Sequence, residues 1–314
     1  MSVGSDIRDA INRRLYNNLL SYENMNTQID INLYAYGNAA QNVDCEQGAS
    51  VLQHALKQTD FAPQLQFQPA LQVSMRKQQK QALSDIEQLS TSLALSTQQS
   101  VLAHRFFITL GGDHSAAIGS WSGAANAING DLGLIWFDAH MDSHTPQTSL
   151  TQNIHGMPLA ILLGYGEPEL TNLLSPKPKL KPENCVLIGI RSYEADEEKL
   201  LKKLGVKIFY MDDIKKMGMH EVVKQSVAIV TQNTSCFGVS IDLDGFDPAD
   251  APGVGTRAAS GIRAAEFLPE FPFIAHHPQL IGADVVEFNP KLDLDRKTEK
   301  LAVALCQQLH LRVS

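Results

Sequence analysis

The chain has 314 residues, of which 44% are hydrophobic and 19% are charged, a composition typical of a folded globular protein. Its formal net charge of −8 argues against a general nucleic-acid surface, and no apolar run approaches the length of a membrane span. We therefore expect neither a nucleic-acid partner nor a membrane segment.

The N-terminus and the cysteines indicate a cytoplasmic protein. The first residues lack the apolar core of a signal peptide. The cysteines lie far apart and form no Cys-x-x-Cys pair; they are Cys45, Cys185, Cys236 and Cys306. We interpret them as core thiols in a reducing compartment rather than as disulfides or zinc ligands.

Short apolar runs alternate with helical patterns along the chain. The runs expected to form strands are Ile29–Tyr36, Phe106–Leu110, Leu132–Phe137, Cys185–Ile190, Lys207–Met211, Cys236–Ile241 and Leu280–Phe288. The spacing of apolar residues predicts helices over Ser74–Ala103, Glu194–Leu204 and Met219–Thr231. This alternation indicates an α/β fold with a parallel sheet and helices on both faces. We find no domain boundary and expect a single domain over residues 1–314.

The first hundred residues carry the fewest patterns. The polar segment Ala40–Gly48 resembles a loop. We interpret it as an ordinary surface loop, and the alternative is that it reaches the mouth of a site.

Three short segments concentrate acidic and histidine side chains: Gly-Gly-Asp-His-Ser at 111–115, Asp-Ala-His-Met-Asp at 138–142, and Ser-Ile-Asp-Leu-Asp at 240–244. The last two close apolar runs that predict buried strands. Because residues two apart on an extended segment point the same way, we expect the donors of each segment to face one site. Ligands bind beyond the carboxyl ends of such strands, and carboxylates gathered there repel each other unless cations lie between them.

The donor set favours two metal ions. Carboxylates with a minority of imidazoles suit Mn²⁺ or Mg²⁺ better than a structural zinc site. Six donors are many for one catalytic zinc, and they suit a pair of ions that share bridging carboxylates. Each segment alone has a simpler interpretation. Asp113 or Ser115 could cap a helix, and Asp-x-His could be a polar turn.

Together the three segments resemble the ureohydrolases, the family of arginase, agmatinase and their relatives. The resemblance runs from about Gly111 to Glu287, and it implies a doubly wound parallel sheet in a three-layer sandwich. It also implies a pair of Mn²⁺ ions per chain, with a bridging hydroxide as nucleophile. In this family pattern His114 and Asp142 bind one ion, His140 and Asp244 bind the other, and Asp138 and Asp242 bridge them.

The resemblance assigns two further residues to the reaction. His155, in Asn-Ile-His-Gly, matches a histidine that shuttles protons, and imidazole titrates near neutral pH. Glu287, in Val-Val-Glu-Phe-Asn-Pro, matches a glutamate that pairs with the guanidinium of the substrate. Considered alone, His155 would be interpreted as a buried structural histidine, and Glu287 as a helix cap or a solvent-facing residue.

The loops around the motifs are more similar to arginase than to agmatinase. His155 lies fifteen residues after His140, and Asp-Ala-Pro-Gly-Val-Gly-Thr ends at Thr256. Three positions expected to bind the substrate's tail differ from the usual arginase residues, which are Asn, Ser and Asp; here they are His144, Thr151 and Glu194.

We therefore expect an amidinohydrolase that acts on a small guanidino substrate, with L-arginine favoured. The alternatives are agmatine, a guanidino acid or formimidoylglutamate as substrate, or a catalytically silent metal-binding protein. The family resemblance also implies a homo-oligomer, a trimer or a hexamer.

Overall fold

The computed structural model describes residues 28–40, 43–73 and 79–312. Its strands form one parallel sheet in the order β2-β1-β3-β8-β7-β4-β5-β6. The strands are β1 (Ile29–Tyr34), β2 (Leu65–Phe67), β3 (Phe106–Gly111), β4 (Leu132–Phe137), β5 (Cys185–Ile190), β6 (Lys207–Tyr210), β7 (Cys236–Asp242) and β8 (Leu280–Val286). The expected parallel α/β sheet is confirmed.

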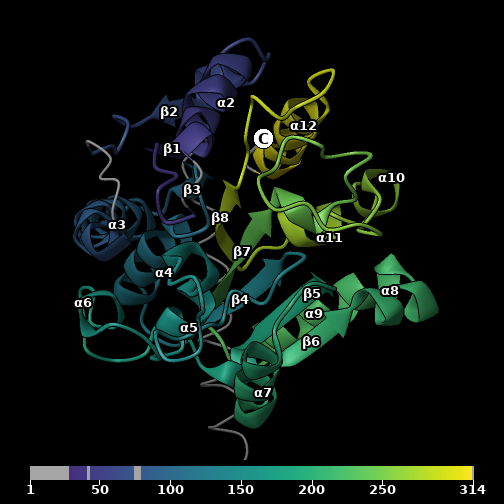
Figure 1. Ribbon diagram of the computed structural model, residues 1–314. Helices are drawn as coiled ribbons and strands as arrows, with labels where there is room; N and C mark the ends of the chain where they lie inside the picture. The colour runs from purple at the N-terminus through teal and green to yellow at the C-terminus, as the bar shows by residue number, and fades with distance from the viewer. Residues whose placement is uncertain (1–27, 41–42, 74–78, 313–314) are drawn as a thin grey trace, which may run out of the picture.

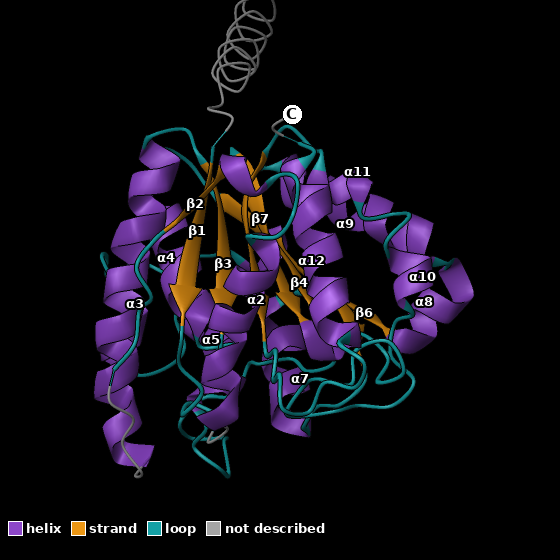
Figure 2. Cartoon of the chain, turned by 90° about the horizontal axis from the view of Figure 1, so that it is seen from above, coloured by secondary structure: helices purple, strands orange, loops and turns teal. Residues whose placement is uncertain are grey.

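Helices cover both faces of the sheet, as Figures 1 and 2 show. One face packs on α2 (Gly48–Leu56), α8 (Met211–Met217), α9 (Met219–Gln232), α11 (Pro272–Ala275) and α12 (Lys297–His310). The other packs on α3 (Gln79–Leu102), α4 (Ala116–Ala127), α5 (Pro158–Leu162), α6 (Pro168–Thr171) and α7 (Ala195–Leu204). A short helix, α10 (Ala264–Phe267), lies in the segment between β7 and β8. The three-layer sandwich is confirmed.

Alternate residues of each central strand enter opposite layers. Phe106 and Ile108 of β3 join one apolar cluster, whereas Phe107 packs against Trp121 of α4 in the other. All six residues of β4 are buried. A strand buried on both faces needs apolar side chains at every position, which explains why continuous apolar runs predicted these strands.

The structure differs from the expected elements mainly at their ends and near the N-terminus. The expected strand Ile29–Tyr36 ends at Tyr34, and Met211 begins α8 instead of ending β6. Strand β2 was not predicted, because it has only three residues and lies at the sheet edge. The helix expected over Ser74–Ala103 is present as α3 from Gln79 to Leu102, and residues 74–78 lie outside the described residues, so its expected start is not tested.

The segment Ala40–Gly48 is not the ordinary surface loop that we expected. Its residues Val43–Gln47 form a 3₁₀ helix, and Cys45 is fully buried. The Cys45 Sγ lies 3.5 Å from the carbonyl oxygen of Phe288 and 3.9 Å from Oε2 of Glu287. This segment therefore reaches the site described below.

All four cysteines are buried and free of disulfides, as expected for core thiols. Among the described residues, no helix is long and apolar enough to cross a membrane.

The close approach of β7 to α4 generates a prediction about stability. A Cβ added to Gly238 would lie 2.0 Å from Cζ3 of Trp121, which is fully buried. We expect Gly238→Ala to lower the free energy of unfolding by about 1–3 kcal/mol, because the indole has no space into which to move. Urea denaturation measures this change. Gly156→Ala is the control, since no atom lies within 4 Å of its added Cβ. Equal stability of the two variants would contradict the prediction.

Candidate metal centre

Four neighbouring strands in the middle of the sheet have their carboxyl ends on the same side of the sheet. Their spatial order is β3, β8, β7 and β4, and all run parallel, so their carboxyl ends meet there. The residues that the sequence predicted for the site follow or end these strands: His114 after β3, Glu287 after β8, Asp242 and Asp244 at β7, and Asp138, His140 and Asp142 after β4.

The first group of donors surrounds the imidazole of His114. Its Nδ1 lies 2.9 Å from Oδ2 of Asp142, 3.1 Å from Oδ2 of Asp242 and 3.3 Å from Oδ2 of Asp138. Although it is buried, this nitrogen makes no aligned hydrogen bond to any of them. Donor atoms that crowd together without a proton aligned between them suit a cation that binds them all. These four donor atoms lie within 4.8 Å of one another.

The second group of donors surrounds His140. Its Nδ1 lies 3.2 Å from Oδ2 of Asp244 and 3.4 Å from Oδ1 of Asp138. Asp138 therefore offers one oxygen to each group. Asp242 joins the first group through Oδ2, and its Oδ1 accepts a hydrogen bond from the backbone N–H of Asp244 at 2.8 Å.

Strand alternation does not aim these side chains, contrary to our sequence interpretation. Strand β4 ends at Phe137, so residues 138–142 lie in a loop, and Asp142 has a φ of 45°. Asp244 lies in a 3₁₀ turn after the end of β7. The loops gather the carboxylates because they follow adjacent parallel strands.

The electrostatics of the site also suit bound cations. Burial raises the pKa of Asp242 well above its usual range, and the charges of Asp244 and Asp138 add to this effect. Burial likewise raises the pKa of Asp244 to about 6, against the opposing influence of His140. Burial lowers the pKa of His114, but its carboxylate neighbours outweigh this and raise it well above the ordinary value. Divalent cations would stabilise the ionised carboxylates and the neutral imidazoles.

Residues outside the donor set orient His114. Its Nε2 lies 2.9 Å from Oγ of Ser240, which donates a 2.5 Å hydrogen bond to Asp284. The ring stacks on Trp136 at a centroid distance of 4.1 Å, and the Trp136 Nε1–H donates to Asp138. Sequence reasoning missed Trp136 and Asp284, because both lie inside apolar strands. Ser240 opens the third acidic segment, which was the available signal for its role.

His155 and Glu287 meet beside the donor groups. Nδ1 of His155 lies 3.1 Å from Oε1 of Glu287, which also accepts a hydrogen bond from the backbone N–H of His114. Burial lowers the pKa of His155, but the hydrogen bond and charge of Glu287 raise it to about 9. Glu287 is buried and has a φ of 64°, in the left-handed region. Such a backbone conformation in a non-glycine residue is uncommon and often occurs at functional sites.

Of the three residues expected to bind the substrate's tail, His144 and Glu194 contact each other. Nε2 of His144 lies 2.5 Å from Oε2 of Glu194. Thr151 is exposed, and its hydroxyl accepts a hydrogen bond from the backbone N–H of Asn153 at 3.2 Å.

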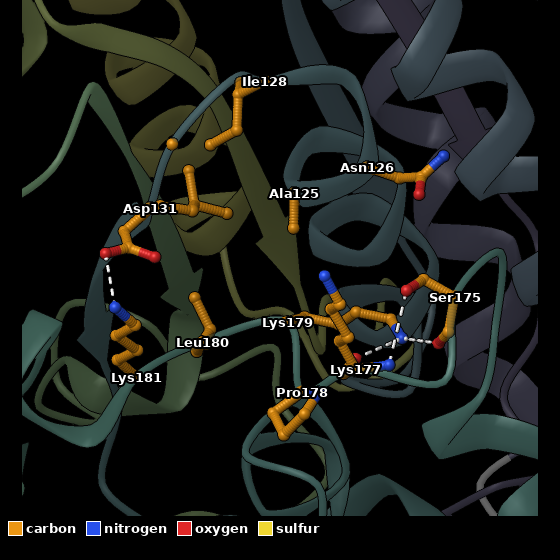
Figure 3. A pocket seen from close by; sticks show the side chains of 12 residues that line it. Ala125, Asn126, Ile128, Asp131, Ser175, Lys177, Pro178, Lys179, Leu180 and Lys181 are labelled. Carbon is orange, nitrogen blue, oxygen red and sulfur yellow. Dashed lines mark hydrogen bonds and ion pairs between the residues drawn. The ribbon is translucent and has the colours of Figure 1, made fainter.

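A separate cavity of about 580 Å³ lies near the opposite end of the sheet, between the end of α4 and the start of β4 (Figure 3). Lys179 lines it, but its ammonium group already donates to the carbonyl oxygens of Thr171, Ser175 and Lys177. Lys181, also at its edge, pairs with Asp131 at 2.7 Å. The cavity contains none of the site residues that the sequence predicted.

Known proteins support one interpretation of this geometry. The chain matches the model of the arginase family over residues 33–311. It is 42% identical to an arginase of Bacillus caldovelox over 72% of this chain and 76% of that one, and 44% identical to an arginase of Brevibacillus brevis over 71% and 74%. A crystal structure of arginase from Bacillus subtilis covers 90% of this chain and 98% of its own, with a TM-score of 0.84 and 34% identity. The chain therefore belongs to the arginase family.

Proposed function

We propose that this protein is a binuclear manganese hydrolase that converts L-arginine and water into L-ornithine and urea. Membership of the arginase family and the relatives named arginase support this proposal. The observation that carries it is the arrangement of six donor residues in two groups, with Asp138 common to both.

Each donor group suits one metal ion. His114 and Asp142 would hold one ion, His140 and Asp244 the other, and Asp138 and Asp242 would bridge them. The two oxygens of Asp138 face different groups, which supports its bridging role. The predominance of carboxylate oxygens favours Mn²⁺. When bound, such a pair supplies Lewis acidity that activates water near neutral pH.

His155 and Glu287 supply the acid and the guanidinium contact. Water adds to the guanidinium carbon, the bond from this carbon to the chain nitrogen breaks, and the departing amine takes up a proton. Glu287 raises the pKa of His155 to about 9, which favours the protonated imidazole that this step requires. A guanidinium at Glu287 competes with His155 for the carboxylate charge and thereby favours release of that proton.

The pair of His144 and Glu194 is complementary to the zwitterionic tail of an amino acid. A ring N–H of His144 can donate to the α-carboxylate, and the carboxylate of Glu194 suits the α-amino group. Thr151 offers a hydroxyl from the same loop as His144. Agmatine lacks the carboxylate, so its binding would forgo the proposed contact with His144.

The proposal extends to the domain organisation, the location and the oligomeric state of the protein. All eight strands of the described residues belong to one sheet, which supports a single domain. The free cysteines support a cytoplasmic location. The family resemblance supports a homo-oligomer, a trimer or a hexamer.

Metal analysis tests the proposed centre. We expect about two Mn²⁺ per chain after loading. Asp138→Ala should lose both ions, because the carboxylate serves both groups, whereas Asp142→Ala should lose mainly one. Neighbouring carboxylates raise the pKa values of His114 and His140, and a metal ion binds a neutral imidazole, so metal uptake should release protons and strengthen as the pH rises. Calorimetry in buffers with different ionisation enthalpies measures these protons. A single tightly held ion under every loading condition would refute the binuclear proposal.

Kinetics separate the proposed proton donor from the metal ligands. His155→Ala should keep its metal content but lower kcat by about 10²–10⁴-fold, the usual effect of removing a well-placed acid. His220→Ala removes an exposed histidine on α9 and serves as the control. Wild-type turnover by His155→Ala would rule out the assignment.

A substrate panel tests the specificity. We expect kcat/KM to be higher for L-arginine than for agmatine or 4-guanidinobutyrate, and we expect Glu194→Ala to narrow this preference. Asp196→Ala changes an exposed carboxylate in the same turn of α7 and should leave the preference unchanged. A wild-type preference for agmatine would exclude the arginase assignment without excluding hydrolysis of guanidino compounds.

A further inference from the structure

A third cluster of metal-binding side chains lies beside the candidate metal centre. It consists of His144, Glu194 and Glu197, whose donor atoms lie within 4.8 Å of one another. His144 comes two residues after Asp142, and the two glutamates lie at the start of α7. The cluster therefore joins the loop after β4 to the helix after β5.

The spacing of the donor atoms suits one small cation. Nε2 of His144 lies 3.5 Å from Oε2 of Glu197 and 2.5 Å from Oε2 of Glu194. A tetrahedral Zn²⁺ with bonds of about 2.0–2.1 Å separates its ligand atoms by roughly 3.3 Å. The first distance is already close to this value. The second requires Glu194 to move slightly outward, and its side chain is 68% exposed.

Hydrogen bonds hold two of the three donor side chains, those of His144 and Glu197, in place. Nδ1 of His144 lies 3.1 Å from Oγ1 of Thr148, which orients Nε2 toward the carboxylates. Glu197 is only 3% exposed, and its oxygens accept hydrogen bonds from the backbone N–H groups of Ser143 and Glu194. An imidazole whose second nitrogen is hydrogen-bonded is the usual arrangement for a metal-binding histidine.

The donor set of this cluster differs from that of the candidate metal centre. One imidazole and two carboxylates would neutralise a divalent ion, and three protein ligands leave a position open to solvent. Imidazole nitrogen and carboxylate oxygen are both common zinc ligands. An ion here would also occupy the groups that we assign to the substrate's tail.

We propose that His144, Glu194 and Glu197 form a separate binding site for a divalent transition-metal ion, Zn²⁺, and that an ion bound there inhibits the enzyme in competition with its substrate. The binding site stands on its own geometry, whereas the inhibition rests on the proposed function.

Zinc titration of the manganese-loaded protein tests the site. We expect about one Zn²⁺ per chain to bind while the Mn²⁺ content stays constant, and we expect the apparent KM for L-arginine to rise with little change in kcat. His144→Ala should abolish this zinc binding. Thr148→Val should weaken it by roughly 10–100-fold through loss of the orienting contact, and Thr148→Ser should restore it.

His220→Ala is the matched control. His220 also pairs with a glutamate, Glu270, at 2.8 Å, but the imidazole is 69% exposed, and among the described residues it forms no ion pair with a second carboxylate. The zinc affinity of His220→Ala should therefore equal that of the wild type. Loss of one Mn²⁺ for each Zn²⁺ gained, or equal zinc affinity in the wild type and His144→Ala, would overturn the proposal. Absence of arginine hydrolysis with Mn²⁺ alone would instead refute the proposed function, while the zinc count would still test the cluster.

Discussion

The repulsion among four buried carboxylates is the constraint on which the rest of the site depends. Asp138, Asp142, Asp242 and Asp244 are each at most 6% exposed, and they share a small volume with two imidazoles. A buried charge is strongly destabilising unless an opposite charge lies beside it. In the metal-free protein the imidazoles can supply this charge by holding protons, as their raised pKa values indicate. A site that must hold protons in the absence of metal couples metal binding to both pH and stability.

Loops that carry such charges need rigid support, and one arginine supplies much of it. The guanidinium of Arg191, at the end of β5, donates hydrogen bonds to six backbone carbonyl oxygens, including that of Asp244. Carbonyl groups in irregular segments lack the regular partners of helices and sheets, so the guanidinium satisfies several of them at once. Asp113 connects the first acidic segment to another loop. Its carboxylate accepts hydrogen bonds from the backbone N–H groups of Ala39 and Ala40. These contacts hold the loops that carry the proposed ligands.

The sequence predicted those features of the structure that leave a local pattern of residues, and it missed those that depend on tertiary contacts. Apolar runs predicted seven strands within two residues of their ends, because buried parallel strands are apolar throughout. Strand β2 and the path of Cys45 to Glu287 depend on tertiary contacts that leave no local pattern. The acidic segments predicted which residues converge. They did not predict the left-handed backbone of Asp142 and Glu287, since propensity disfavours that conformation at both residues.

The two ends of the proposed substrate site obey different physical limits. At the metal end, a change to His114 or Asp138 would leave other buried charges without a partner, so substitution there is costly. At the other end, Glu194 and Thr151 are exposed, so a new side chain at either position can be solvated. The residues that bind the guanidinium group can therefore stay constant while the proposed tail-binding residues vary. The same freedom allows His144 and Glu194 to form the pair that we propose for both a zwitterionic tail and a metal ion, because an imidazole beside a carboxylate can bind either one.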